Sequence, residues 1–287
     1  MSTRFFCSFM SNAIYGKLVE TNLTGECTML FEHLTSPDVK EAAEKGLVAV
    51  LPIGSIEIHG PHMPTGTDSI TVYKVAKMAA EKEEAVVLPP LYYAYVPENR
   101  HFPGTISLTA KTLLSVLEEV CDEIARNGFK KILIVNGHGG NNPLLKVFLR
   151  DSLAKKKSYV LYAMIDPWAP LHELTEKLRE GRIIGHACEL ETSVGLYLFR
   201  DLIKMENVKR PAKTGSTGLP NGIQTSVDWQ AFAVEVYLGD PRFATNEKGK
   251  MLVEKMVAFL ADAIAKIKRD EKVPRILDEF YKKAYKQ

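Results

Sequence analysis

The 287-residue sequence predicts an α/β protein in which helices cover both faces of a mainly parallel sheet. Short apolar runs alternate with longer segments of helical periodicity along most of the chain. Two of the runs, 47–53 and 131–135, are apolar at nearly every position, as strands buried on both faces are. Because crossovers between parallel strands are right-handed, the carboxyl ends of all these strands should meet at one edge of the sheet.

The strands are recognised by β-branched, apolar residues between glycine- or proline-containing turns. The run 85–88 leads into Pro89-Pro90, and 131–135 leads into a glycine-rich loop. The expected strands are 47–53, 85–88, 131–135 and 159–165.

The helices are recognised by apolar residues at three- and four-residue spacing and by their ends. Pro37 opens the first clear helix and Gly46 ends it. Asp68 and Thr109 stand at N-cap positions, and Gly128 closes the helix that Thr109 begins. The expected helices are a short one from Met29 and longer ones at 38–45, 69–82, 109–127, 143–154, 172–179, 189–202 and 245–268, with a helical tail to Gln287.

Composition excludes several classes of protein. The net charge of +2, without a long basic run, gives no indication of a nucleic-acid partner. No apolar run reaches the ~18 residues of a membrane span, so no membrane partner is expected. The four cysteines are widely spaced and form no CxxC pair, which is typical of reduced thiols in the cytoplasm.

Potential metal ligands are concentrated in the loop after the first strand, which reads LPIGSIEIHGPHMPTGTD from 51 to 68. Glu57 and His59 are two residues apart and point to the same side of an extended segment. Asp68, at the following helix start, can turn back towards them. Two carboxylates and an imidazole suit zinc, manganese or iron. The alternative is a polar loop whose Asp68 merely caps a helix.

Two further motifs follow later in the chain. The first, NGHGGN at 136–141, comes directly after a buried strand and offers His138 as a ligand; its alternative is a phosphate cradle at a helix N-terminus. The second, GHACELETS at 185–193, opens a helix. The alternative for its acids is that carboxylates simply favour a first helical turn.

The spacing within GHACELETS separates its two glutamates. His186 and Glu189 are three residues apart and share a helical face, whereas Glu191 lies nearly opposite Glu189. The two glutamates are therefore not expected to bind the same ion. Trp168 and Trp229 could each cover a substrate ring or pack in the interior.

These three motifs, with FPGTISL between them, resemble the creatininase (creatinine amidohydrolase) family from about Met29 to about Lys255. The resemblance implies a three-layer α/β/α sandwich, a two-metal site and a homo-hexamer. Residues 1–28 would then be an N-terminal extension and 29–287 a single hydrolase domain. By resemblance, one metal is bound by Glu57, Asp68 and His138, and the second by His59, Asp68 and Glu189.

The resemblance also assigns His186 as the catalytic histidine and Glu191 as a glutamate that supports His186 or the metal ligands. The sequence leaves Glu191 as the alternative to Glu189 for the ligand of the second metal. The chain departs from creatininase proper at three positions. Gly139 and Gly140 stand where creatininase has a tyrosine and a carboxylate, and Arg182 stands where it has a tryptophan. These departures argue against creatinine as the substrate.

The sequence therefore predicts a hydrolase that uses two divalent metal ions, zinc first and manganese or iron as alternatives, on a small polar substrate. The expected reaction is attack of a metal-activated hydroxide on the C=O of a cyclic amide, a formamide or a similar C–N bond. One alternative is hydrolytic ring opening of a cyclic diketone in inositol or carbohydrate breakdown. Another, from a different class, is a phosphate- or nucleotide-binding protein that hydrolyses nothing.

Overall fold

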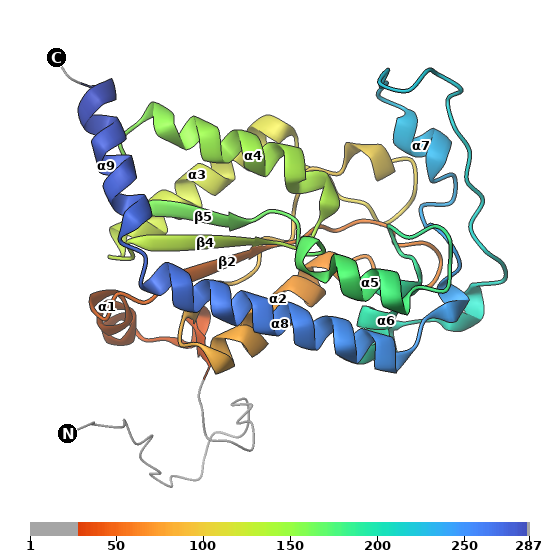
Figure 1. Cartoon of the computed structure of the whole chain (residues 1–287), viewed down its shortest axis with the longest axis horizontal. Coiled ribbons are helices and arrows are strands. Elements are labelled where there is room, and N and C mark those ends of the chain that lie inside the picture. Colours follow the sequence, from red (N-terminus) through yellow and green to blue (C-terminus); the bar gives the residue numbers. More distant parts are fainter. Residues whose placement is uncertain (1–27, 286–287) are drawn as a thin grey trace, which may run out of the picture.

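The computed structural model describes residues 28–285 and contains one five-stranded, wholly parallel sheet with helices on both faces (Figure 1). This confirms the predicted fold class. The extension expected at 1–28 lies almost entirely outside the described residues. The strands are β1 (Met29–Leu30), β2 (Ala49–Ile53), β3 (Val86–Val87), β4 (Lys131–Asn136) and β5 (Val160–Met164).

The helices lie close to the predicted ranges, except that no helix was expected at Asp228–Phe232. Thr109 and Thr245 are N-cap residues, and the side-chain oxygen of each accepts a hydrogen bond from the backbone amide three residues later. The helices are α1 (Ser36–Glu44), α2 (Thr67–Lys82), α3 (Ala110–Arg126), α4 (Asn142–Asp151), α5 (His172–Leu178), α6 (Glu189–Leu198), α7 (Asp228–Phe232), α8 (Asn246–Lys268) and α9 (Lys272–Ala284).

Two local expectations were wrong. Met29 begins no helix, because Met29 and Leu30 pair with β3 at the edge of the sheet and a short 3-10 turn follows them. Asp68 is not an N-cap either. Helix α2 begins at Thr67 with Gly66 as its N-cap, and the Asp68 carboxylate bonds to side chains from other loops.

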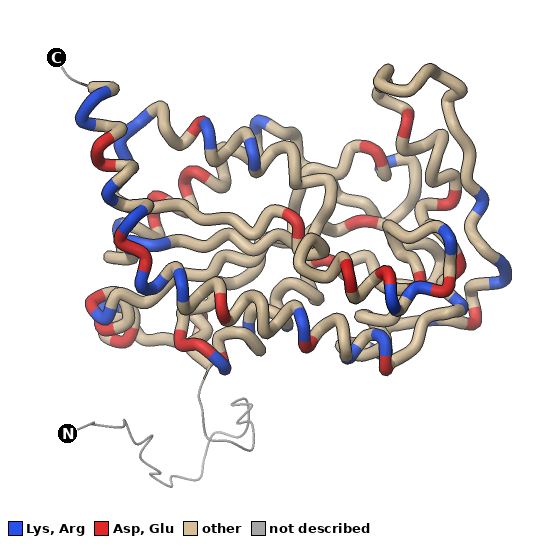
Figure 2. The backbone as a smooth tube through the Cα atoms, in the orientation of Figure 1, with Lys and Arg blue, Asp and Glu red and all other residues tan. Residues whose placement is uncertain are grey.

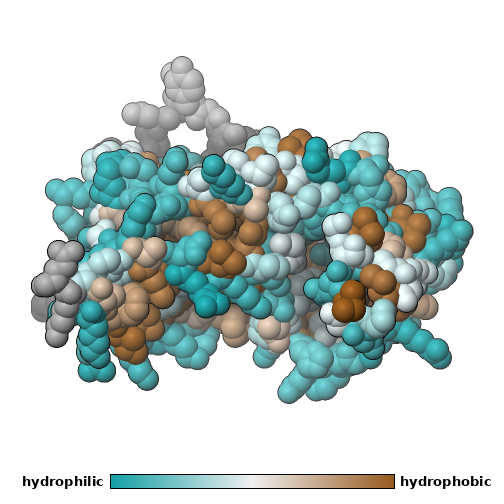
Figure 3. All heavy atoms as spheres, turned by 90° about the horizontal axis from the view of Figure 1, so that it is seen from above, coloured by the Kyte–Doolittle hydropathy of each residue, from teal (hydrophilic) through white to brown (hydrophobic). Residues whose placement is uncertain are grey.

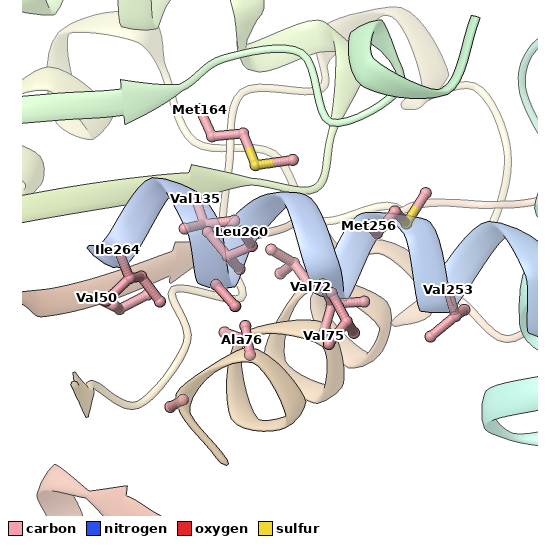
Figure 4. Close-up of a cluster of buried hydrophobic side chains, with 14 of the residues drawn as sticks. Val50, Val72, Val75, Ala76, Val135, Met164, Val253, Met256, Leu260 and Ile264 are labelled. Carbon is pink, nitrogen blue, oxygen red and sulfur yellow. The ribbon is translucent and has the colours of Figure 1, made fainter. Parts of the chain in front are cut away.

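The central strands divide the core into two layers because successive side chains point to opposite faces. Val48 and Val50 face a cluster formed with α2, α6 and α8, whereas Leu51 and Ile53 face a cluster formed with α1, α3 and α4. Figure 4 shows Val50 with side chains of α2 and α8 in the first cluster. Helices α6 and α8 approach so closely that a Cβ on Gly249 would lie 1.9 Å from the carbonyl oxygen of Ser193.

The strand order is β1-β3-β2-β4-β5, so the chain leaves β2 for β3 on one side and then crosses to β4 on the other. In parallel α/β sheets such a switch point opens a crevice at the carboxyl ends of the two strands, and ligands bind there. Here the loops after Ile53 and Asn136, the last paired residues of β2 and β4, meet at that crevice. Among residues 28–285, no helix is long and apolar enough to cross a membrane.

Candidate metal centre

The loop after β2 returns to its own starting point, and this brings the first turn of α2 against the strand end. Gly54 permits the contact, since a Cβ there would lie 2.3 Å from the Ser69 hydroxyl oxygen. That hydroxyl donates to the carbonyl oxygen of Ser55 at 2.9 Å. The Ser55 hydroxyl in turn lies 2.8 Å from Asp68 Oδ2 and 3.1 Å from Glu57 Oε1. Carboxylates eleven residues apart in sequence are thereby held side by side.

Asp68 lies between two imidazoles and presents one carboxylate oxygen to each. Its Oδ1 is 3.1 Å from Nε2 of His59, and its Oδ2 is 3.0 Å from Nδ1 of His138. All three side chains are almost fully buried. A carboxylate that faces two ligand sets in this way has the geometry of a bridging ligand between two cations.

Glu57 completes the set on the His138 side. Its Oε1 lies 2.6 Å from His138 Nδ1, and its Oε2 accepts a hydrogen bond from Asn99 Nδ2 at 2.5 Å. Ligand atoms of Glu57, Asp68 and His138 all lie within 4.8 Å of one another. The structure thus brings together the three residues expected to hold the first metal.

Glu191, and not Glu189, completes the other set. Ligand atoms of His59, Asp68 and Glu191 lie within 4.8 Å of one another, and Glu191 Oε2 is 3.9 Å from His59 Nε2. The Ala187 backbone amide donates to the same Glu191 oxygen. The expectation that Glu189 is the metal ligand and that Glu191 supports His186 does not fit these contacts.

Glu189 points to the opposite side of α6, as the helical spacing of the two residues requires. Its carboxylate accepts hydrogen bonds from the backbone amides of Glu180 and Gly181, at 2.8 and 2.5 Å. Lys248 Nζ of α8 lies 3.3 Å away and balances its charge. This buried carboxylate is therefore satisfied by the loop before His186 and by α8, and it is absent from the described ligand groups.

His186 is carried into the site by a loop with unusual backbone angles. Gly185 and Ala187 have φ of 155° and 49°, and the latter is rare for a residue with a side chain. The His186 ring stacks obliquely on His59, with centroids 4.1 Å apart. Its Nε2–H donates to the carbonyl oxygen of Ile58 at 2.8 Å, which leaves Nδ1 as the nitrogen that can exchange a proton.

The pKa values show that the centre attracts positive charge. Burial alone would lower the pKa of His59, but the carboxylates of Asp68, Glu191 and Glu57 raise it to about 10. Against the same effect of burial, Glu57 and Asp68 raise the pKa of His138 well above its usual range. Buried carboxylates that favour positive charge on neighbouring groups also favour a bound cation. The oxygen and nitrogen donors fit zinc, manganese or iron.

A cavity of about 870 Å³ opens onto this cluster. Glu57, Asp68, His138, His186 and Glu191 all line it, so most of the candidate ligands face the same space. Figure 3 views the molecule from the α4 side, and exposed apolar side chains (brown) are visible at the end where α7 lies. Helix α7 contributes Trp229 to the lining of the cavity.

Two residues that line the cavity were not predicted from the sequence. Asn99 is fully buried; besides donating to Glu57, its Oδ1 accepts a hydrogen bond from the Trp229 indole N–H at 2.6 Å. Glu98, its neighbour, lines the cavity, and burial raises the pKa of its carboxyl. Both sit on a 3-10 turn, Pro97–Asn99, whose sequence carries no ligand motif.

Both tryptophans line the cavity, and Trp168 also packs against the hydrophobic core. The Trp229 ring stands edge-on to the His186 ring, with centroids 5.7 Å apart. His62, the other histidine of the loop after β2, belongs to none of the described ligand groups. Its Nε2 forms a hydrogen bond with the Thr192 hydroxyl at 2.8 Å, and burial lowers its pKa to about 4. Burial raises the pKa of the Cys188 thiol to about 11, which leaves it a poor nucleophile.

A buried cluster of carboxylates and imidazoles at the carboxyl edge of a parallel α/β sheet is the arrangement of a metal-dependent hydrolase. Comparison with known proteins gives the same class. The creatininase family, described as creatinine amidohydrolase, matches residues 32–264. The chain belongs to the creatininase family and is a metal hydrolase of that family.

Similarity to individual members is moderate and spread over several activities. The chain is 30% identical over 238 residues to a creatinine amidohydrolase of Pseudomonas putida, covering 76% of this chain and 88% of the relative. It is 28% identical over 186 residues to a 3-dehydro-scyllo-inosose hydrolase of Thermotoga maritima, covering 61% of this chain and 58% of the relative. A crystal structure of creatininase superposes with a TM-score of 0.72 at 26% identity, over 85% of this chain and 99% of that one.

Proposed function

We propose that the protein is a binuclear metal hydrolase that cleaves a C–N bond next to a carbonyl, in a cyclic amide, a formamide or a similar group of a small polar substrate. One observation carries this proposal: Asp68 presents its two carboxylate oxygens to two separate histidines, each with its own glutamate. Such a donor set suits two divalent cations that share one carboxylate. The similarity to a creatinine amidohydrolase supports the amide substrate.

The proposed ligands are divided between two ions. Glu57, Asp68 and His138 would hold one, and His59, Asp68 and Glu191 would hold the other. Zinc is the first choice, with manganese or iron as alternatives. Creatininase structures of a Zn–Zn type and with manganese support zinc and manganese.

Bound divalent ions supply Lewis-acid activation of a carbonyl and a water nucleophile at neutral pH. The protein's own residues supply proton transfer and position. His186, tied through Nε2 to the Ile58 carbonyl, presents Nδ1 as the atom that gives a proton to the leaving nitrogen. Trp229 covers this imidazole, and Asn99 fixes the indole by accepting its N–H. The substrate is thereby screened from water beside the proton donor.

Substitutions at the two glutamates of GHACELETS should have different effects on the amount of zinc that the protein binds. Glu191→Gln is expected to bind one zinc ion tightly where the native protein binds two, because a neutral amide replaces a ligand. Glu189→Gln should keep both ions and lose ~1–3 kcal/mol of stability, since it weakens buried hydrogen bonds and removes one of the two carboxylates that pair with Lys248. Metal analysis and calorimetric unfolding measure these effects. Zinc loss in Glu189→Gln together with full occupancy in Glu191→Gln would reverse the assignment.

Ring opening of a cyclic diketone is the second candidate. The similarity to a 3-dehydro-scyllo-inosose hydrolase favours it, and the same ligand set would activate a ketone carbonyl. Phosphate binding without hydrolysis has less support. No lysine or arginine belongs to the described lining of the cavity, and the NGHGGN loop contributes an imidazole that faces carboxylates.

We also propose that the enzyme works in the cytoplasm as a homo-oligomer, a hexamer by family resemblance. The buried, unpaired thiols of Cys121 and Cys188 are compatible with a reducing compartment.

A screen of metal-loaded enzyme tests the proposed function. Protein stripped with a chelator and reloaded with zinc, manganese or iron would be assayed on cyclic amides, formamides and cyclic ketones, with phosphate esters as the comparison. We expect two ions per chain, higher thermal stability on loading, and hydrolysis of an amide-type substrate. A protein that binds no divalent ion and gains no stability from one would refute the proposal.

A further inference from the structure

We propose that the substrate carries a positively charged nitrogen, as an amine, amidine or guanidine, and that Glu98 recognises it; this rests on the function proposed above. The starting observation is the charge of the cavity wall. Among the described lining residues there are five carboxylates and no lysine or arginine. The acidic lining residues are Glu57, Asp68, Glu98, Asp166 and Glu191.

Metal binding accounts for three of these carboxylates and leaves two. Glu57, Asp68 and Glu191 belong to the ligand groups, and their charges would be offset by the cations. Glu98 and Asp166 belong to none of the described groups. In Figure 2 the chain directly after β4 is uncharged and the chain directly after β5 is acidic, while basic residues lie further out on the helices. The wall therefore stays negative after metal binding.

Glu98 occupies space that the chain leaves open beside the metal cluster. A Cβ on Gly140 would lie 3.0 Å from Glu98 Oε1 and 2.3 Å from Nε2 of His138. A larger residue at 140 would displace one of these two groups. Because Gly140 has no side chain, the carboxylate of Glu98 reaches the cavity at this point.

The backbone of Glu98 is fixed, which gives its carboxylate a defined position. Its carbonyl oxygen accepts a hydrogen bond from Gln230 Nε2 at 2.8 Å. The next residue, Asn99, is buried between Glu57 and Trp229 through hydrogen bonds to both. Glu98 is thus held at the junction of the metal cluster and the segment that covers it.

Among residues 28–285, no lysine or arginine nitrogen forms an ion pair with the half-buried carboxylate of Glu98. The positive groups that act on it are the imidazoles of His138 and His186, which belong to the metal cluster and the proton donor. A partly buried carboxylate loses solvation that an incoming cation restores, through charge-assisted hydrogen bonds. Trp168 and Trp229 line the same cavity, and indole rings attract cations. A phosphate or carboxylate on the substrate would meet no lysine or arginine among the described lining residues.

Three matched lactams test this inference on the zinc-loaded full chain. They share a six-membered cyclic amide and carry an aminomethyl, an ethyl or a carboxylate group on the carbon next to the carbonyl. Stopped-flow tryptophan fluorescence at pH 7, read before turnover, would give their Kd values. We expect the aminomethyl lactam to bind about tenfold or more tightly than the ethyl lactam, as a hydrogen-bonded charge does. The carboxylate lactam should bind most weakly.

The variants Glu98→Gln and Glu173→Gln identify the responsible residue. Glu98→Gln keeps the shape and removes the charge, so the preference for the aminomethyl lactam should vanish while two zinc ions stay bound. Glu173→Gln makes the same change at an exposed site on α5 outside the cavity lining and should keep the preference. Equal binding of all three lactams by the native protein, or zinc loss in Glu98→Gln, would overturn the inference. Failure of the native chain to bind zinc, manganese or iron would instead refute the proposed function.

Discussion

Asp68→Asn should abolish both metal sites together and reduce kcat by on the order of 10³ or more. Each oxygen of this carboxylate faces a different histidine, so the substitution removes the shared negative charge from both ligand groups and replaces one of the two donor oxygens by an NH₂ group that cannot bind a metal. Loss of a single electrostatic stabiliser already costs ~10²–10³ in kcat, and this variant loses two. Zinc content per chain and steady-state kinetics measure the outcome.

The matched control is Asp262→Asn. Asp262 lies on the exposed face of α8, where it pairs with Lys266 four residues later, and the same chemical change there should alter neither zinc content nor kcat. Retention of two tightly bound zinc ions by Asp68→Asn would mean that Asp68 does not join the two sites.

His186→Gln should lower kcat by about 10²–10⁴ while both metal ions stay bound. Glutamine can still donate to the Ile58 carbonyl, as His186 Nε2 does, but it cannot deliver a proton near neutral pH. Single-turnover kinetics, with zinc analysis of the same samples, measure both effects.

His101→Gln is the control for this variant, because His101 is exposed and lies outside the cavity lining. A ring nitrogen of His186 also lies within 4.8 Å of ligand atoms of Glu57 and His59. Loss of one zinc ion in His186→Gln would therefore show that His186 serves as a ligand and not as the proton donor.

The sequence predicts the longer strands of this fold better than the two-residue strand β1. Strands β2 and β4 are buried on both faces, and their unbroken apolar runs identify them. Strand β1, at one edge of the sheet, has only two residues, and pairing with β3 decides its conformation more than local propensity does. The short helix expected from Met29 failed for this reason.

The candidate site was also predicted only in part from the sequence. Loops that follow adjacent parallel strands must meet, so Glu57, His59 and His138 could be grouped from sequence. Periodicity also separates Glu189 from Glu191. Which of the two faces inward depends on where α8 places Lys248, and no local pattern encodes that contact.

Glu98 and Asn99 could not be found from sequence for a related reason. Asn99 meets Glu57 over 42 residues and Trp229 over 130. The 3-10 turn that carries both residues has no recognisable ligand spacing. A long-range contact without a motif becomes visible only when the fold is known.

Anomalous diffraction from crystals grown with zinc tests the central claim most directly. We predict two peaks at the carboxyl edge of the sheet, one contacting Glu57 and His138, the other contacting His59 and Glu191, with Asp68 contacting both. A single peak, two peaks that do not share Asp68, or a peak at Glu189 would contradict the binuclear site proposed for this enzyme.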